Sequence, residues 1–164
     1  MLLGKVEPGS RVDFVKSGVG VAVRAGAPKP DISSGDALKR TLLAATSIGY
    51  SSGPSGVYLE GLFQRMGITE QLRPKLRQTP SGVPVGEILA KGEVEIGFQQ
   101  VSELIHVRGI DFVGALPPDI QQVTIFSAGS HTGATQREAA KAWVRFLTSP
   151  AAVPVIRKNG LEPG

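Results

Sequence analysis

The fold is decided by one short stretch of sequence, TSIGYSSGPSG at residues 46–56. Residues 46–50 read as a short strand, and the small residues of 51–56 follow it as a turn. Pro54 suits the first turn of a helix, because the N–H that proline lacks would have no partner there. Leucines and a phenylalanine then recur at helical spacing. The stretch therefore predicts a strand, a turn and a helix in that order.

The rest of the chain repeats this alternation. Further strands are expected near residues 12–23, 76–79, 94–98, 110–116 and 123–127. Helices are expected after the capping box Ser33-x-x-Asp36, from residue 85, at 101–107, at 134–147 and after 149–150. In the helix of residues 134–147, one face would carry Ala139, Ala142, Trp143, Phe146 and Leu147. Alternating strands and helices predict the α/β class with a mainly parallel sheet.

The order of the strands also predicts two lobes. The strand-rich segments near residues 12–23 and 121–129 bracket a self-contained α/β block. We expect a complete lobe at residues 25–120. Residues 1–24 and 121–164 would form part of a second lobe, and the chain would cross between the lobes and return.

Composition excludes several classes of function. The 164 residues include no cysteine, which rules out disulfides, thiol catalysis and cysteine-bound zinc. The net charge is +4, but the basic residues are scattered and aromatic residues make up only 5%, so we expect no nucleic-acid binding. No apolar run approaches the ~20 residues that a membrane-spanning helix needs.

Motifs for enzymatic chemistry are also missing from the sequence. The two histidines, His106 and His131, read as a helix-end residue and a surface-loop residue. Glu93 and Glu95 alternate along a predicted strand and read as a solvated edge. No zinc-protease, P-loop or dinucleotide motif occurs. We therefore expect no enzyme, no metal and no cofactor.

Three loops of small residues offer a different chemistry. They follow predicted strands at residues 51–56, 79–83 and 127–130, and the first two run directly into helices. The start of a helix presents unpaired N–H groups and the positive end of its dipole, which can hold an anion. Serine hydroxyls add donors, and glycine lets a ligand approach the backbone. Loops of this kind can equally be ordinary α/β connections that bind nothing, so both interpretations stay open.

In their order and spacing, several segments resemble bacterial extracellular solute-binding proteins of the molybdate-binding type. The resemblance extends over nearly the whole chain. It rests on residues 18–32 and the helix after them, Tyr50-Ser51 with Ser55-Gly56-Val57-Tyr58, residues 92–97 with Gln99-Gln100, and the carboxyl-terminal segments 139–142, 146–147, 149–150 and 160–163.

The resemblance implies a type II periplasmic binding fold, in which two lobes close over a ligand. It implies periplasmic capture of a small oxyanion such as molybdate and delivery to the membrane subunits of an ABC transporter, without metal, cofactor or covalent step. By position, the ligand contacts would be Ser51, Ser52, Ser55, Gly82, Val83 and Gln100. Gln100 lies where molybdate-binding relatives have a tyrosine.

Two departures from the family pattern shape our expectations. We expect the chain to lack the usual amino-terminal strand–helix segment and a signal peptide, because Lys5 and Glu7 follow Met1 too closely for a signal-peptide core. One lobe would then be incomplete and would expose apolar surface, which predicts self-association, such as a homodimer. If Met1 is the true start, the protein would be cytoplasmic. The alternative functions are then a cytosolic ligand-sensing or regulatory module of the same fold, or a truncated remnant that does not bind.

Overall fold

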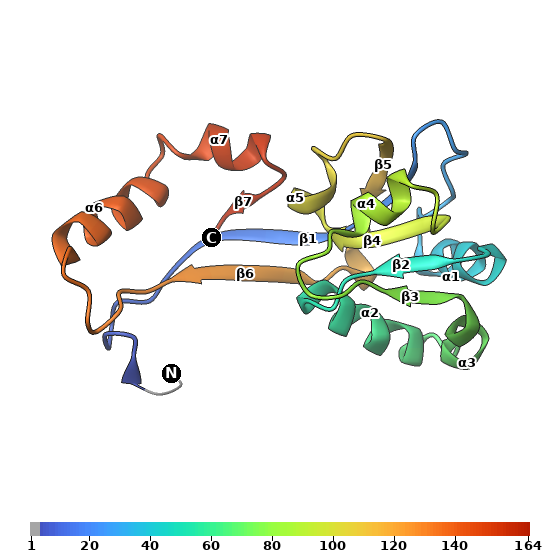
Figure 1. The fold of residues 1–164 in the computed structure, drawn as a ribbon, viewed down its shortest axis with the longest axis horizontal. Helices are drawn as coiled ribbons and strands as arrows, with labels where there is room; N and C mark the ends of the chain where they lie inside the picture. Colours follow the sequence, from blue (N-terminus) through green and yellow to red (C-terminus); the bar gives the residue numbers. More distant parts are fainter. Residues whose placement is uncertain (1–3) are drawn as a thin grey trace. The chain divides into compact units, whose positions relative to one another are not determined.

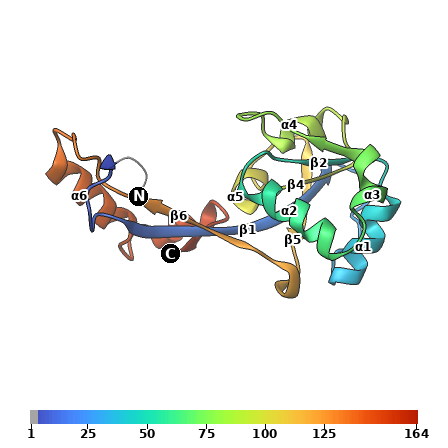
Figure 2. The ribbon, with the colours of Figure 1, turned by 90° about the horizontal axis from the view of Figure 1, so that it is seen from below.

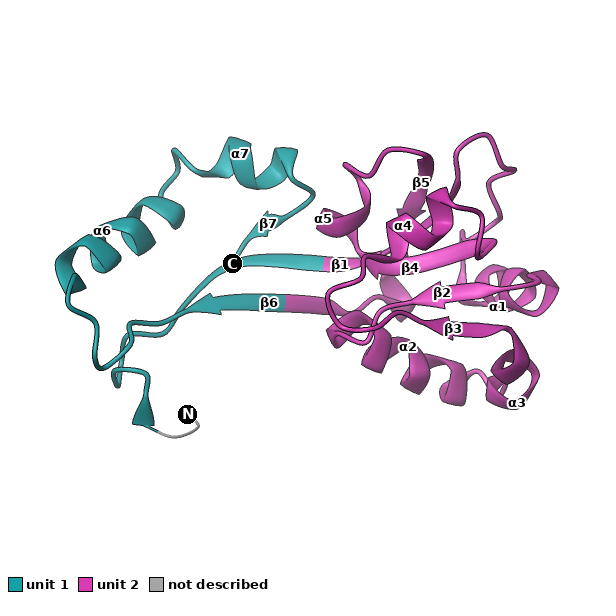
Figure 3. Cartoon of the chain, in the orientation of Figure 1, with its two compact units in different colours: residues 1–17, 125–164 teal, residues 18–124 magenta. Residues whose placement is uncertain are grey.

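The chain folds into two compact units (Figure 3). The computed structural model describes residues 4–164; residues 1–3, the first residues of the predicted partial lobe, lie outside the described residues. One unit comprises residues 18–124, and the other comprises residues 1–17 and 125–164. The chain passes from unit to unit within two strands, β1 (Val12–Arg24) and β6 (Val123–Ala128).

The unit of residues 18–124 is built on one sheet. Its strands are ordered β3-β2-β4-β1-β5. Strand β2 is parallel to β3 and β4, whereas β1 is antiparallel to both β4 and β5. Four strands therefore run in one direction, as the alternation of strands and helices predicts. The reversed strand is β1, and it spans residues 12–24 without a break. The bounds of the other four are β2 (Ile48–Tyr50), β3 (Leu76–Gln78), β4 (Ile96–Gln100) and β5 (Ile110–Ala115).

Helices cover both faces of this sheet (Figures 1 and 2). On one face lie α1 (Gly35–Ala44), α2 (Pro54–Arg65) and α3 (Thr69–Leu72), with the 3-10 turn Arg73–Lys75 after them. On the other lie α4 (Val85–Ala90) and α5 (Val101–Leu104). A further 3-10 turn, Pro118–Ile120, precedes β6. The first face buries the larger core, which includes Leu38, Leu42, Leu59, Leu62, Phe63 and Leu72, and the second buries Ala22, Val85, Leu89, Val94 and Leu104.

Helix α1 begins one residue later than the capping box predicts. Its N-cap is Ser34, whose Oγ accepts the N–H of Ala37 at 3.1 Å. Ser33 instead donates its own N–H to Asp31 Oδ1 at 2.9 Å. The aspartate side chain therefore holds Ser33 in the preceding turn, and the next serine takes the capping role.

A pair of glycines lets α4 lie close to the sheet. Gly49 of β2 and Gly97 of β4 are paired in register. A Cβ on Gly97 would lie 2.5 Å from Leu89 Cδ1 and 2.8 Å from Val85 Cγ1, both on α4. Any larger residue at this position would push the helix away from the strand.

The side chain of Gln121 pairs with the backbone of β1. Its Oε1 accepts the N–H of Val19 at 2.7 Å, and its Nε2 donates to the carbonyl oxygens of Val19 at 3.0 Å and Leu116 at 3.2 Å. The amide thus bonds to both backbone groups of Val19, as a neighbouring strand would. Gly18 makes room for it, because a Cβ there would lie 2.9 Å from Gln121 Cδ.

The other unit contains α6 (Arg137–Leu147), α7 (Val153–Lys158) and β7 (Glu162–Pro163), which pairs antiparallel with β1. Its small core consists of Val15, Ala152 and Ile156. Helix α6 buries none of its residues. Trp143 is 59% exposed and Phe146 is 50% exposed, and their rings stack with centroids 5.7 Å apart. The apolar face predicted for this helix therefore faces solvent. Within residues 4–164, no helix has the length and apolar character to cross a membrane.

The exposed rings of α6 predict self-association. Stacked aromatic side chains in contact with water favour burial against another apolar surface. At micromolar concentration we expect light scattering to report the mass of at least two chains. The double substitution Trp143→Gln with Phe146→Gln should shift that mass toward one chain. Val57→Gln, which replaces an exposed apolar residue of the other unit, should leave it unchanged. A monomeric wild type would contradict the prediction.

Candidate functional site

Two buried serines lie where β2 gives way to α2. Ser51 directly follows the strand and is 9% exposed, and Ser55, the second residue of the helix, is 2% exposed. Their hydroxyl oxygens are 2.9 Å apart, and either can donate to the other. Ser51 Oγ also accepts the N–H of Gly53 at 3.3 Å. We call Ser51 and Ser55 the serine pair.

Gly56 allows the serine pair to form. A Cβ at this position would lie 1.7 Å from the carbonyl oxygen of Ser51 and 3.3 Å from the ring of Tyr50. The first distance is far inside van der Waals contact, so a side chain at residue 56 would force the strand end and the helix apart. Glycine is required here for space.

The first turn of α2 keeps one backbone donor available. The N–H groups of Gly56 and Val57 both bond to the carbonyl of Gly53, at 3.0 and 3.1 Å, and Pro54 has no N–H. Within the described part of the chain, the N–H of Ser55 is then the donor of this turn without an acceptor. The N-cap, Gly53, supplies no capping side chain. This donor lies at the positive end of a 12-residue helix, where negative charge is favoured.

Thr79, directly after the strand next to β2, contributes a third buried hydroxyl at this edge of the sheet. It follows β3, is 3% exposed, and donates its N–H to the carbonyl of Tyr50 at 2.9 Å. Its Oγ1 has no hydrogen-bond partner among the described residues. The sequence places Thr79 in a small-residue loop but not in the site. Its sequence signal was its place at the start of the small-residue loop of residues 79–83.

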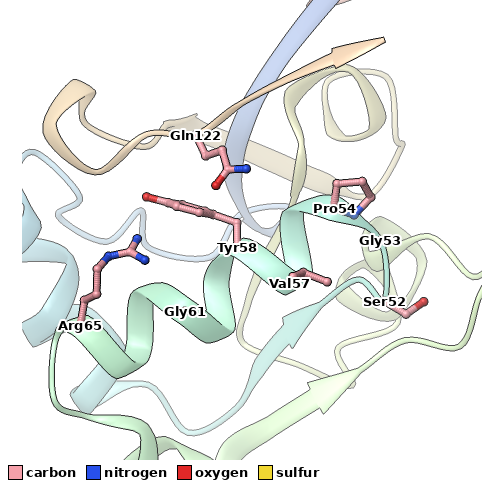
Figure 4. Close-up of a pocket in the computed structure, with 8 residues that line it drawn as sticks. All are labelled: Ser52, Gly53, Pro54, Val57, Tyr58, Gly61, Arg65 and Gln122. Carbon is pink, nitrogen blue, oxygen red and sulfur yellow. The ribbon is translucent and has the colours of Figure 1, made fainter. Parts of the chain in front are cut away.

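Ser52 lies apart from the serine pair. It is exposed and lines an open groove of about 580 Å³ with Gly53, Pro54, Val57, Tyr58, Gly61, Arg65 and Gln122 (Figure 4). The side chain of Ser52 points away from the ring of Tyr58 (Figure 4). The Arg65 guanidinium lies 5.2 Å from the centroid of that ring, and Tyr58 Oη donates to the carbonyl of Ile120 at 2.5 Å.

The second predicted loop uses its donors internally. Gly82 is exposed with φ +84°, and the N–H of Val83 donates to the carbonyl of Pro80 at 3.1 Å. The N–H of Val85, where α4 begins, donates to Gln99 Oε1 at 2.8 Å. No hydrogen bond in residues 4–164 joins Gly82 or Val83 to the serine pair. Their contact with a ligand stays a prediction.

Gln100 lies at the end of β4, on the same edge of the sheet as the serine pair. Tyr50, the last residue of β2, is opposite Phe98 in the parallel β2–β4 register, so Gln100 lies two residues beyond that pair, at the edge where Ser51 follows β2. Gln100 is 3% exposed, and its Nε2 donates to Thr124 Oγ1 at 2.7 Å. Its amide is therefore buried near the proposed site but is already hydrogen-bonded.

The buried hydrogen-bonding side chains described above are neutral. Ser51, Ser55, Thr79, Gln99 and Gln100 contribute hydroxyl and amide groups. Burial raises the pKa of the neighbouring Tyr50, and the hydrogen bond of its Oη to Glu60 Oε1 at 3.2 Å raises this pKa further. Tyr50 therefore stays protonated at neutral pH and anchors the end of β2. In the part of the chain that the structure describes, no cluster of three acidic or histidine side chains could hold a metal ion.

Comparisons with known proteins point to one family. Residues 2–162 match the sequence profile described as "Bacterial extracellular solute-binding protein". The chain is 45% identical over 161 residues to an aconitate isomerase of Pseudomonas sp, and 30% identical over 158 residues to a molybdate-binding protein of Rhodobacter capsulatus. These alignments cover 98% and 96% of the chain. The chain spans 61% of the length of each relative.

The fold of this chain is also similar to that of a solved periplasmic binding protein. The periplasmic molybdate-binding protein of Azotobacter vinelandii superimposes with a TM-score of 0.69 at 19% identity, over 96% of this chain and 70% of that one. The α/β periplasmic-binding fold that the sequence predicts is thereby confirmed. At this identity the likeness extends to the fold alone.

Gly56→Ala tests the packing of the serine pair. We expect the overpacked variant to lose about 1–3 kcal/mol or more of stability. At about 2–4 °C per kcal/mol, its melting temperature should fall by several degrees in calorimetry. Gly61→Ala on the same helix is the matched control, because its Cβ would meet only Arg65 Nη1, at 3.4 Å. That variant should gain stability, since alanine is the better helix former by about 0.5–1 kcal/mol. Equal melting of the two variants would show that residue 56 is not constrained.

Proposed function

The chain belongs to the family of bacterial extracellular solute-binding proteins, and from that premise we propose that it binds a small oxyanion for an ABC transporter. One observation carries the proposal: a buried serine pair, 2.9 Å apart, at the start of a long helix whose Ser55 N–H is available. We place the ligand at this point. Its oxygen atoms would accept from the Ser51 and Ser55 hydroxyls and from the Ser55 N–H.

Neutral donors suit this task. An anion that leaves water must replace its hydration with hydrogen bonds, and a poorly matched anion is rejected because it leaves donors or oxygens unpaired. The helix dipole favours negative charge. Because the described residues of the site carry no formal positive charge to form an ion pair with the anion, the ligand can also be released. Selectivity would then follow from the number and placement of the donors.

The other predicted contacts have different parts in this proposal. Ser52 would contact the ligand only from the exposed rim of the groove. The N–H of Val83, next to Gly82, would have to leave the carbonyl of Pro80, and the Gln100 amide would have to leave Thr124. We therefore assign the primary contacts to the serine pair, whose mutual hydrogen bond one hydroxyl would exchange for the ligand. Gly82, Val83 and Gln100 form a second set that depends on local rearrangement, and Ser52 is a rim contact.

The names of the two relatives narrow the class of ligand. One is a molybdate-binding protein, and the other is an isomerase of aconitate, a tricarboxylate. Both molecules are small anions whose oxygens accept hydrogen bonds, which is the chemistry that hydroxyls and a helix N–H recognise. We propose a periplasmic location and delivery to the transporter's membrane subunits. A cytosolic ligand-sensing module of the same fold is the alternative.

A second candidate function is isomerisation of a small polycarboxylate. The 45% identity to the aconitate isomerase favours it. Proton-transfer catalysis needs a base within hydrogen-bond reach of the substrate. The serine pair and its buried neighbours provide hydroxyls and amides, which are weak bases on their own. Such an activity would need a base, such as a carboxylate, in addition to these groups, so we rank it second to binding.

Thermal shifts with a panel of anions test the proposed binding. The panel contains molybdate, tungstate, sulfate, phosphate and both geometric isomers of aconitate. A ligand at about 100 times its dissociation constant stabilises the fold by about 2.7 kcal/mol. We therefore expect one oxyanion to raise the melting temperature by about 5–10 °C.

Single substitutions locate the site in the same assay. Ser55→Ala should remove the shift, because it deletes a primary donor. Ser33→Ala, on an exposed serine before α1, should keep it. No shift with any anion, in a wild-type protein that melts cooperatively, would refute the proposal.

An NMR assay separates binding from catalysis. Each aconitate isomer is incubated with the protein, and the vinyl proton signals are followed over hours. We expect the isomers to interconvert no faster than in buffer. A conversion rate that rises in proportion to protein concentration would favour the isomerase candidate instead.

A further inference from the structure

Thr79 has a buried hydroxyl that the protein itself leaves unpaired. The residue is 3% exposed, and its Oγ1 has no hydrogen-bond partner among residues 4–164. Buried polar groups nearly always have a partner, so an exception calls for a reason. Valine has almost the same shape as threonine and suits the end of a strand equally well. Packing therefore explains the branched side chain but not its oxygen.

The backbone places Thr79 next to the serine pair. Tyr50 is opposite Gln78 in the parallel β2–β3 register, so Ser51 and Thr79 are the next residues on neighbouring strands. The Thr79 N–H donates to the carbonyl of Tyr50 at 2.9 Å, which continues the ladder one residue beyond the strands. Neighbouring strands lie about 4.8 Å apart. A ligand held at the serine pair would therefore lie within reach of this third residue.

We propose that Thr79 is a specificity-determining residue whose Oγ1 donates to the bound anion; this rests on the proposed function. Together with the Ser51 and Ser55 hydroxyls and the Ser55 N–H, it supplies donors for an anion with at least three oxygens around one centre. A tetrahedral oxyanion has that geometry, whereas a single carboxylate presents only two oxygens. The third hydroxyl thus selects tetrahedral oxyanions.

The chain offers a matched control. Thr69, at the start of α3, also has a buried Oγ1 without a partner among the described residues. It precedes β3, whereas Thr79 follows it, so the two lie at opposite ends of that strand. Replacing either threonine with valine removes a buried unpaired hydroxyl and should leave the free protein as stable as before, or more stable. Only the substitution at residue 79 should affect binding.

Calorimetric titration with sodium molybdate tests the proposal on the wild type and on four variants. Thr79→Val should weaken binding about 10-fold or more, as expected for the loss of a hydrogen bond to an anion. Thr79→Ser, which keeps the hydroxyl, should stay within about 3-fold of the wild type by the same reasoning. Thr69→Val should bind like the wild type, and Ser55→Ala should bind weakly.

The outcomes separate the two claims. If Thr79→Val binds molybdate like the wild type while Ser55→Ala does not, the role of Thr79 is refuted and the proposed site stands. If the wild type binds neither molybdate nor any other tetrahedral anion of the thermal-shift panel, or if Ser55→Ala binds equally well, the oxyanion site itself is refuted. Loss of binding in both Thr79→Val and Thr79→Ser would assign residue 79 a structural role instead.

Discussion

The candidate site depends on the contact between residue 56 and the carbonyl of Ser51, which has no room for a Cβ. Because Gly56 lies directly against this carbonyl, α2 begins immediately beside the end of β2. That approach buries Ser51 and Ser55, brings their hydroxyls within 2.9 Å of each other, and directs the positive end of the helix toward the same edge of the sheet. Thr79 joins them because β3 pairs with β2 in parallel register. One missing side chain therefore positions several donors.

Local chemistry made much of this arrangement predictable. Proline and glycine in residues 51–56 predicted the turn and the start of the helix. The spacing of the apolar residues after them predicted which face of the helix is buried. Features set by distant residues could not be read in the same way. The reversed direction of β1 is one such feature. This strand lies between β4 and β5, whose residues come much later in the sequence. The capping serine of α1 depended on which N–H the Asp31 carboxylate takes. In α6, the spacing of apolar residues predicted an apolar face. It could not predict that this face is left exposed by the described residues.

The residues of the candidate site show the same limit. Ser51 and Ser55 were identifiable because small polar residues at a strand-to-helix turn have a recognisable chemistry. Thr79 opened one of the candidate loops but was not assigned a ligand contact, because a threonine after a strand has many ordinary roles. Its burial and its unpaired oxygen distinguish it in the structure. Val83 shows the reverse case. Its position beside a helix start suggested an available N–H, but the turn of residues 80–83 already uses that donor. The sequence shows which side chains are present, whereas the tertiary structure determines which acceptor each hydrogen-bond donor uses.

The amide of Gln121, which bonds to both backbone groups of Val19, has a consequence for how this chain can evolve. It fits only because residue 18 has no side chain. A mutation that adds a Cβ at position 18 displaces the amide. Loss of the amide removes the acceptor of the Val19 N–H, whereas the Val19 carbonyl keeps the N–H of Leu116 at 3.0 Å. The two positions, 103 residues apart in the sequence, therefore constrain each other sterically: a larger residue at position 18 requires the side chain at position 121 to move or to change.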